Sequence, residues 1–211
     1  MHVGSFEGQD VFVKYLFKEK KDGLFLDIAC DDPIHGSNTY LLEQELNWDG
    51  FCFDLKDYNN NPFPLSKGKW NDNRKHSKFI MMDATSDDLT LFLKENIKDQ
   101  VVDYISLDVD DRGIRNLSHL VLPKILEAGI KFKSMTMEHE EFKHGDGDIN
   151  PIRENLMSQG YIMLFKNITF DTGQAFEDWW INPIYFSNDI ISLKTENIYW
   201  KEAVEKIKIL K

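Results

Sequence analysis

Acidic residues that follow short apolar segments are the first side chains in this sequence that could do chemistry. Five successive segments each carry carboxylates at or just beyond their ends, namely Asp31 and Asp32, Asp54, Asp83, Asp108 with Asp110, and Glu138. One acid in such a place is ordinary turn chemistry, but five in succession form a pattern. In an open parallel sheet, ligands bind beyond the carboxyl ends of the strands. The pattern therefore predicts a ligand site with an acidic rim at that edge.

The order of these acids suggests separate roles. A carboxylate that closes the second strand can accept hydrogen bonds from both hydroxyls of a ribose, and Asp54 lies there. Asp83, which Ala84 follows, could accept a hydrogen bond from an adenine amino group. Asp27 and Asp108 flank the middle of the expected sheet, where negative charge would favour a cationic group.

The loop after the first apolar segment is poor in glycine. Between Asp27 and Gly36 the only glycine is Gly36 itself, whereas nucleotide-binding turns normally use glycines to let the backbone approach the ligand. This argues against a pyrophosphate ligand, and so against a nicotinamide or nucleotide-sugar enzyme. A cofactor without phosphates needs the tight turn less.

Seven segments rich in β-branched and aromatic residues read as strands, and segments with apolar residues three and four apart read as helices between them. The strands are expected at 24–29, 50–54, 78–82, 103–107, 132–138, 161–165 and 177–182, and the helices at 40–46, 89–96, 117–127 and 152–159. Continuous apolar strands that alternate with helices require a sheet covered on both faces. The sequence predicts an α/β protein with a Rossmann-like, doubly wound, mostly parallel sheet of seven strands.

The whole chain, 1–211, is expected to form one domain. A leading helical segment occupies 1–22, with its helix at 9–19, and a C-terminal helix lies within 195–211. The segment 56–77 has no regular pattern; loops of this length are often lids or binding loops, and a surface insertion is the alternative. The net charge of −11 argues against a nucleic-acid partner. Because no apolar run approaches about 20 residues and no leader pattern or disulfide framework is visible, we expect no membrane span and a cytoplasmic location.

Several ordered motifs resemble the FkbM family of methyltransferases. They are 23–29 (GLFLDIA), 36–43 (GSNTYLLE), 48–54 (WDGFCFD), 104–110 (YISLDVD), Glu138 with His139, Gly160 with Tyr161, and 177–180 (EDWW). The resemblance spans nearly the whole chain. It implies the methyltransferase form of the sheet and O-methylation with S-adenosyl-L-methionine, with a sugar, a glycan or another polyhydroxylated small molecule as acceptor. The cofactor contacts it implies are Asp27, Ile28, Ala29, Asn38, Asp54, Asp83, Ala84 and Asp108.

The candidate catalytic residues are Asp108, Glu138 and His139. His139 could be the general base, since the ordinary pKa of histidine lies near neutrality. Alternatively, all three residues could hold a divalent cation such as magnesium, which would acidify an acceptor diol. A purely structural His139 is the third interpretation.

Two departures from the family pattern suggest an alternative function. Ala29 and Pro33 stand where relatives have glycine, and Pro33 stiffens the loop and removes an amide donor. The alternative function is therefore a catalytically degenerate, methyltransferase-like binding protein.

Overall fold

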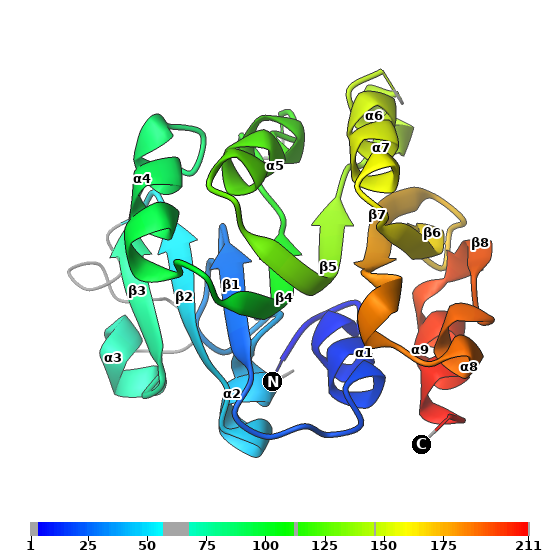
Figure 1. The fold of residues 1–211 in the computed structure, drawn as a ribbon, viewed down its shortest axis with the longest axis horizontal. Helices are drawn as coiled ribbons and strands as arrows, with labels where there is room; N and C mark the ends of the chain where they lie inside the picture. Colours follow the sequence, from blue (N-terminus) through cyan, green and yellow to red (C-terminus); the bar gives the residue numbers. More distant parts are fainter. Residues whose placement is uncertain (1–3, 57–67, 112–113, 146, 211) are drawn as a thin grey trace.

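The computed structural model describes residues 4–56, 68–111, 114–145 and 147–210. Within these residues one eight-stranded sheet has the order β3-β2-β1-β4-β5-β7-β6-β8 (Figure 1). The strands are β1 Leu24–Ile28, β2 Asp49–Asp54, β3 Ser77–Met81, β4 Val101–Leu107, β5 Lys131–Glu138, β6 Ile162–Thr169, β7 Ala175–Ile181 and β8 Thr195–Tyr199. The Rossmann-like, doubly wound sheet is confirmed, but the expected number of seven strands is wrong.

The pairing directions decide which strand ends meet. Strands β1 to β5 pair in parallel, so their carboxyl ends share one edge of the sheet. Strand β7 runs antiparallel to both β5 and β6, and its register places Glu177 opposite Glu138. The start of β7 therefore lies at the same edge as the end of β5.

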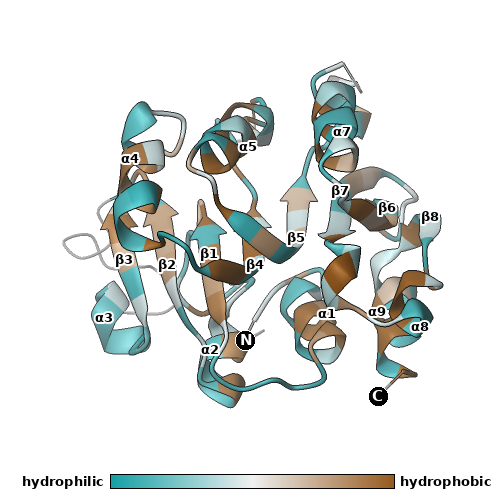
Figure 2. Ribbon diagram, viewed as in Figure 1, coloured by the Kyte–Doolittle hydropathy of each residue, from teal (hydrophilic) through white to brown (hydrophobic). Residues whose placement is uncertain are grey.

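Helices cover both faces of the sheet, and each face has its own core (Figure 1). The helices on one face are α1 Gln9–Leu16, α2 Tyr40–Leu46, α3 Trp70–Asn73, α8 Asn188–Ile191 and α9 Trp200–Lys208. Those on the other face are α4 Asp87–Asn96, α5 Ser118–Glu127 and α7 Ile149–Ser158. The short helix α6 Glu141–His144 contacts β7, and the 3-10 turn η1 Pro183–Tyr185 follows the end of β7. Strand β1 shows the alternation that feeds both cores, because Phe25 belongs to the first and Leu26 and Ile28 to the second. Brown apolar segments along the strands and two-coloured helices in Figure 2 follow this arrangement.

The structure adds two elements that the sequence analysis did not expect. The C-terminal helix expected within 195–211 begins only at Trp200, because Thr195–Tyr199 pairs in parallel with β6 as an edge strand. Only Ile198 of this strand is buried, so the strand lacks the run of buried apolar residues that marks a central strand. The expected loop 56–77 contains α3, whose Trp70 is buried; residues 57–67 lie outside the described part of the chain. No described helix is long and apolar enough to cross a bilayer.

Candidate functional site

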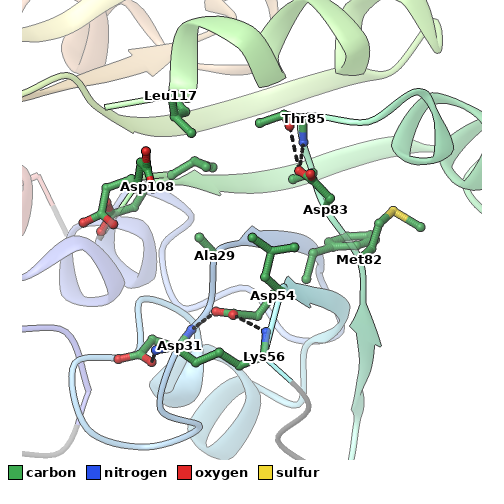
Figure 3. A pocket seen from close by; sticks show the side chains of 15 residues that line it. Ala29, Asp31, Asp54, Lys56, Met82, Asp83, Thr85, Asp108 and Leu117 are labelled. Atoms are coloured by element: carbon green, nitrogen blue, oxygen red, sulfur yellow. Dashed lines mark hydrogen bonds and ion pairs between the residues drawn. The ribbon is translucent and has the colours of Figure 1, made fainter. Parts of the chain in front are cut away.

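A cavity of about 500 Å³ opens at the carboxyl ends of β1 to β4 (Figure 3). Five of the predicted cofactor residues line it, namely Ala29, Asp54, Asp83, Ala84 and Asp108. The parallel pairing explains this convergence, because residues that follow neighbouring strands reach the same edge. The other lining residues are Asp31, Phe53, Leu55, Lys56, Met82, Thr85, Val109, Asp110, Asp111 and Leu117.

Asp54 ends β2, and the backbone holds its carboxylate in place. Oδ2 accepts from the amide of Asp31 at 3.2 Å, and Oδ1 accepts from the amide of Lys56 at 2.9 Å (Figure 3). Burial raises the pKa of Asp54, although these amides and the Lys56 ammonium act against that rise. Each oxygen has a second lone pair with which to accept a hydroxyl.

Asp83 lies just beyond β3 and is exposed at the rim of the cavity. The amide and the hydroxyl of Thr85 both donate to its Oδ1, at 2.8 and 2.7 Å (Figure 3). This turn fixes the carboxylate beside the buried Ala84, which also faces the cavity.

Ala29 has a left-handed backbone, with φ of 65°. Its amide donates to the carbonyl of Phe53 at 2.8 Å, so the chain turns away from β1 while still bonded to β2. Left-handed conformations favour glycine because they crowd a Cβ against the carbonyl oxygen. The left-handed backbone therefore explains why glycine would be favoured at this position, and alanine adopts this conformation with some strain.

A second cavity, of about 170 Å³, shares Ala29, Asp31 and Asp108 with the first. The predicted residues Asp27 and Asn38 line it, together with Phe6, Cys30, His35 and Gly36. Asp27 is 2% exposed and its Oδ2 accepts from the Thr39 hydroxyl at 2.6 Å, while Asn38 donates to the Ser106 hydroxyl at 3.0 Å. Ile28 differs from the other predicted contacts: its side chain is fully buried in the core.

Arg74 supports this loop, and the sequence analysis missed it. The side chain is 1% exposed and donates to Glu43, to the carbonyl of Pro33 at 3.1 Å and to the hydroxyl of Thr39 at 3.0 Å. Pro33 lost an amide donor but keeps the carbonyl that Arg74 binds. The only signal in the sequence was a lone arginine in a segment without regular pattern, which is too weak to locate a buried network.

Asp108 and Glu138 end the neighbouring strands β4 and β5, and their carboxyl groups are hydrogen-bonded to each other. Burial and the nearby negative charge of Asp108 raise the pKa of Glu138 far above its ordinary range. The raised pKa favours the protonated form of Glu138, in which its hydroxyl can donate to the Asp108 carboxylate. This arrangement brings together two of the three predicted catalytic residues.

His139 does not join them. Its Nδ1 accepts from the amide of Glu141 at 3.1 Å, and its Nε2 lies 3.6 Å from Oδ1 of Asp178 and 3.4 Å from Arg153. Among the described residues, those lining the cavities that contain Asp108 do not include His139. His139 follows the end of β5 and lines a different recess, together with Asn116, Ser118 and His119, whereas Glu138 borders the recess that contains Asp108.

The metal alternative fails for the same reason. Asp108, Glu138 and His139 do not form a ligand set, and the described residues hold no group of three or more His, Cys, Asp or Glu side chains placed to hold a metal ion.

Comparisons with known proteins support the fold. No protein-family model matches the chain, and no curated protein sequence matches it. The structure is similar to that of a putative rRNA-methylase from Clostridium thermocellum, at 16% sequence identity and a TM-score of 0.55, over 86% of this chain and 99% of that one. It is also similar to the METTL16 MTase domain, at 15% identity and a TM-score of 0.48, over 81% of this chain and 64% of that one. The chain therefore has the Rossmann-like fold of S-adenosylmethionine-dependent methyltransferases.

Proposed function

We propose that the protein is an S-adenosylmethionine-dependent O-methyltransferase that acts on a small polyhydroxylated acceptor such as a sugar. The observation that carries this proposal is the pair of cavities that meet at Ala29, Asp31 and Asp108, with carboxylates at the ends of β2, β3 and β4. Cavities of about 300–1,000 Å³ are typical of small-molecule sites. The FkbM motifs support the O-methyl specificity, and membership of that family stays a prediction.

The residues present fit the cofactor. The ribose hydroxyls would donate to Asp54, whose two oxygens keep free lone pairs, and the adenine amino group would donate to Asp83. The methionine part would lie in the smaller cavity, where Asp27 and Asp108 favour its sulfonium and ammonium groups and Asn38 adds polar contact. When bound, the cofactor supplies an electrophilic methyl group.

Asp108 is the group that we propose as the proton acceptor. It borders both cavities, and Glu138 holds its carboxylate through a hydrogen bond. Asp108 would orient an acceptor hydroxyl that donates to it and would take the hydroxyl proton when the methyl group moves from sulfur to that oxygen, which would leave the cofactor as a neutral thioether. His139 becomes a positioning residue for the segment after β5, through its contacts with Asp178 and Glu141.

The charge of the rim supports a small acceptor rather than a nucleic acid. Asp31, Asp110 and Asp111 line the larger cavity, and the whole chain carries a net charge of −11. A polyphosphate backbone would meet repulsion at this rim. A structural neighbour is described as a putative rRNA-methylase, so RNA belongs among the acceptors tested.

Calorimetric titration with S-adenosylmethionine and S-adenosylhomocysteine tests the proposal. We expect Asp54→Ala to weaken both at least about tenfold, because a hydrogen bond to a charged group contributes about 1.5–3 kcal/mol. Asp49→Ala is the matched control, since Asp49 is exposed at the other end of the same strand. No binding at millimolar cofactor would refute the enzyme, whereas binding without methyl transfer to sugars or RNA would favour the degenerate binding protein.

A further inference from the structure

A smaller recess of about 70 Å³ also borders Asp108, on the side of the sheet edge where β5 meets β7. It is lined by Glu7, Gln9, Asp108, Glu138, Phe170, Phe176 and Glu177. The proposed cofactor contacts use only Asp108 of this set. The volume is sufficient for one polar group of a ligand or several water molecules.

Gln9 gives the first indication of a ligand. The side chain is 5% exposed, and its Nε2 donates to Oε2 of Glu177 at 3.2 Å. Its Oε1 is buried and has no hydrogen-bond partner among the described residues. Buried polar atoms are nearly always paired, so this oxygen is available to accept a hydrogen bond from a donor group in the recess.

The charge of the recess gives the second indication. Three other buried carboxylates have a cation in ion-pair contact: Glu43 has Arg74, Asp178 has Arg153, and Asp103 has Lys20 and Lys133. Glu177 is 2% exposed, and the described residues that line its recess include no Lys, Arg or His. Burial and the negative charge of Asp108 raise the pKa of Glu177 well above its ordinary range.

The aromatic side chains that line the recess indicate which kind of cation could bind there. Phe170 and Phe176 are stacked, with ring centroids 4.1 Å apart and planes 14° apart. Aromatic faces attract ammonium groups, and carboxylates beside them strengthen that preference. The described carboxylates form no group placed to hold a metal ion, which favours an organic cation as the occupant.

We propose that this recess binds a protonated amino group of the methyl acceptor, which makes the acceptor an amino alcohol, amino sugars included. This inference rests on the proposed function, since it presumes a methyl acceptor. The ammonium would donate to Oε1 of Gln9, and its positive charge would favour the ionised form of Glu177. A hydroxyl on the same molecule would then lie near Asp108, which borders the recess and both cofactor cavities.

The test uses the complex with S-adenosylhomocysteine, formed and measured first, so that failure of the proposed function is seen separately. Ligand-observed NMR then compares ethanolamine with ethylene glycol, which replaces the amine by a hydroxyl. We expect ethanolamine to bind at least tenfold more tightly. Glu177→Gln and Gln9→Met should each abolish this preference while S-adenosylhomocysteine affinity stays within twofold, and the exposed Glu45→Gln should leave it intact.

Three outcomes would overturn the inference: equal binding of the two probes by the parent complex, an unchanged preference in both recess variants, or an equal loss in Glu45→Gln. In each case the proposed methyltransferase would still stand, because S-adenosylhomocysteine binding is established beforehand. If Glu177→Gln does not fold, the Gln9→Met variant still measures whether the recess determines the preference for ethanolamine.

Discussion

Nε of Arg74 lies 2.6 Å from Oε2 of Glu43, and both side chains are completely buried. The same guanidinium also binds the Pro33 carbonyl and the Thr39 hydroxyl, and Thr39 donates to Asp27. The ion pair between α2 and the segment before β3 therefore holds the loop that shapes the smaller cofactor cavity. Cζ of Arg74 also lies 5.3 Å from the centroid of the Trp70 ring.

The first prediction concerns this ion pair. Arg74→Met should lower the free energy of unfolding by about 3–5 kcal/mol, because it leaves Glu43 as an uncompensated buried charge. Urea denaturation measures the change. Arg115→Met is the control, since the Arg115 side chain is 69% exposed and its pair with Asp111 should contribute at most about 1 kcal/mol. Equal effects of the two substitutions would contradict the assigned role.

The second prediction concerns the left-handed residue in the cofactor loop. Ala29→Gly should raise the free energy of unfolding by about 0.5–1 kcal/mol, because relief of about 1–2 kcal/mol of left-handed strain exceeds the added chain entropy of glycine. Thermal unfolding monitored by circular dichroism would detect the gain. Ala203→Gly, in the buried face of α9, should instead lose about 1 kcal/mol. A loss at position 29 would show that alanine is unstrained there.

The third prediction is a pH dependence at Glu177. Its pKa is raised in the folded protein, so between its ordinary value and its folded value the native state binds the extra proton. That contribution to stability is present at low pH and is lost as pH rises. Glu177→Gln should therefore gain stability relative to the parent from pH 5 to 8, by up to about 1.4 kcal/mol per pH unit.

Urea denaturation across this pH range measures the effect of Glu177→Gln. The exposed Glu127→Gln, whose side chain is 70% accessible, is the control and should show no such trend. A parallel pH profile for Glu177→Gln and the parent would mean that Glu177 is ionised in the folded protein.

The fourth prediction separates structure from catalysis at His139. His139→Asn should lower the free energy of unfolding by about 1–3 kcal/mol, because the buried partners Asp178 and Arg153 lose a polar contact. The affinity for S-adenosylhomocysteine should stay within twofold, as calorimetry would show. His76→Asn is the control, with a side chain 42% exposed. Lost methyl transfer with unchanged stability would restore His139 as the general base.

The sequence by itself determined the parallel half of the sheet and the acids at its edge. Segments 24–29, 50–54, 78–82 and 103–107 are apolar enough to be strands of a parallel sheet, and that pattern needs no knowledge of distant contacts. Because parallel neighbours share one edge, Asp54, Asp83 and Asp108 were bound to meet once these strands were identified. The positions of these strands, and of the acids that follow them, are therefore encoded in the local hydrophobic pattern.

Only the tertiary structure decided what surrounds Asp108. Gln9 and Glu177 are hydrogen-bonded although 168 positions separate them, and β7 had to run antiparallel between β5 and β6 before Glu177 could face Glu138. Strand β8 was not predicted because an edge strand with one buried residue has no apolar run that would indicate it. The contacts of His139 with Asp178 and Arg153, both distant from it in the sequence, likewise hold it apart from Asp108. Charge pairing across such distances is set by packing, and no local pattern encodes it.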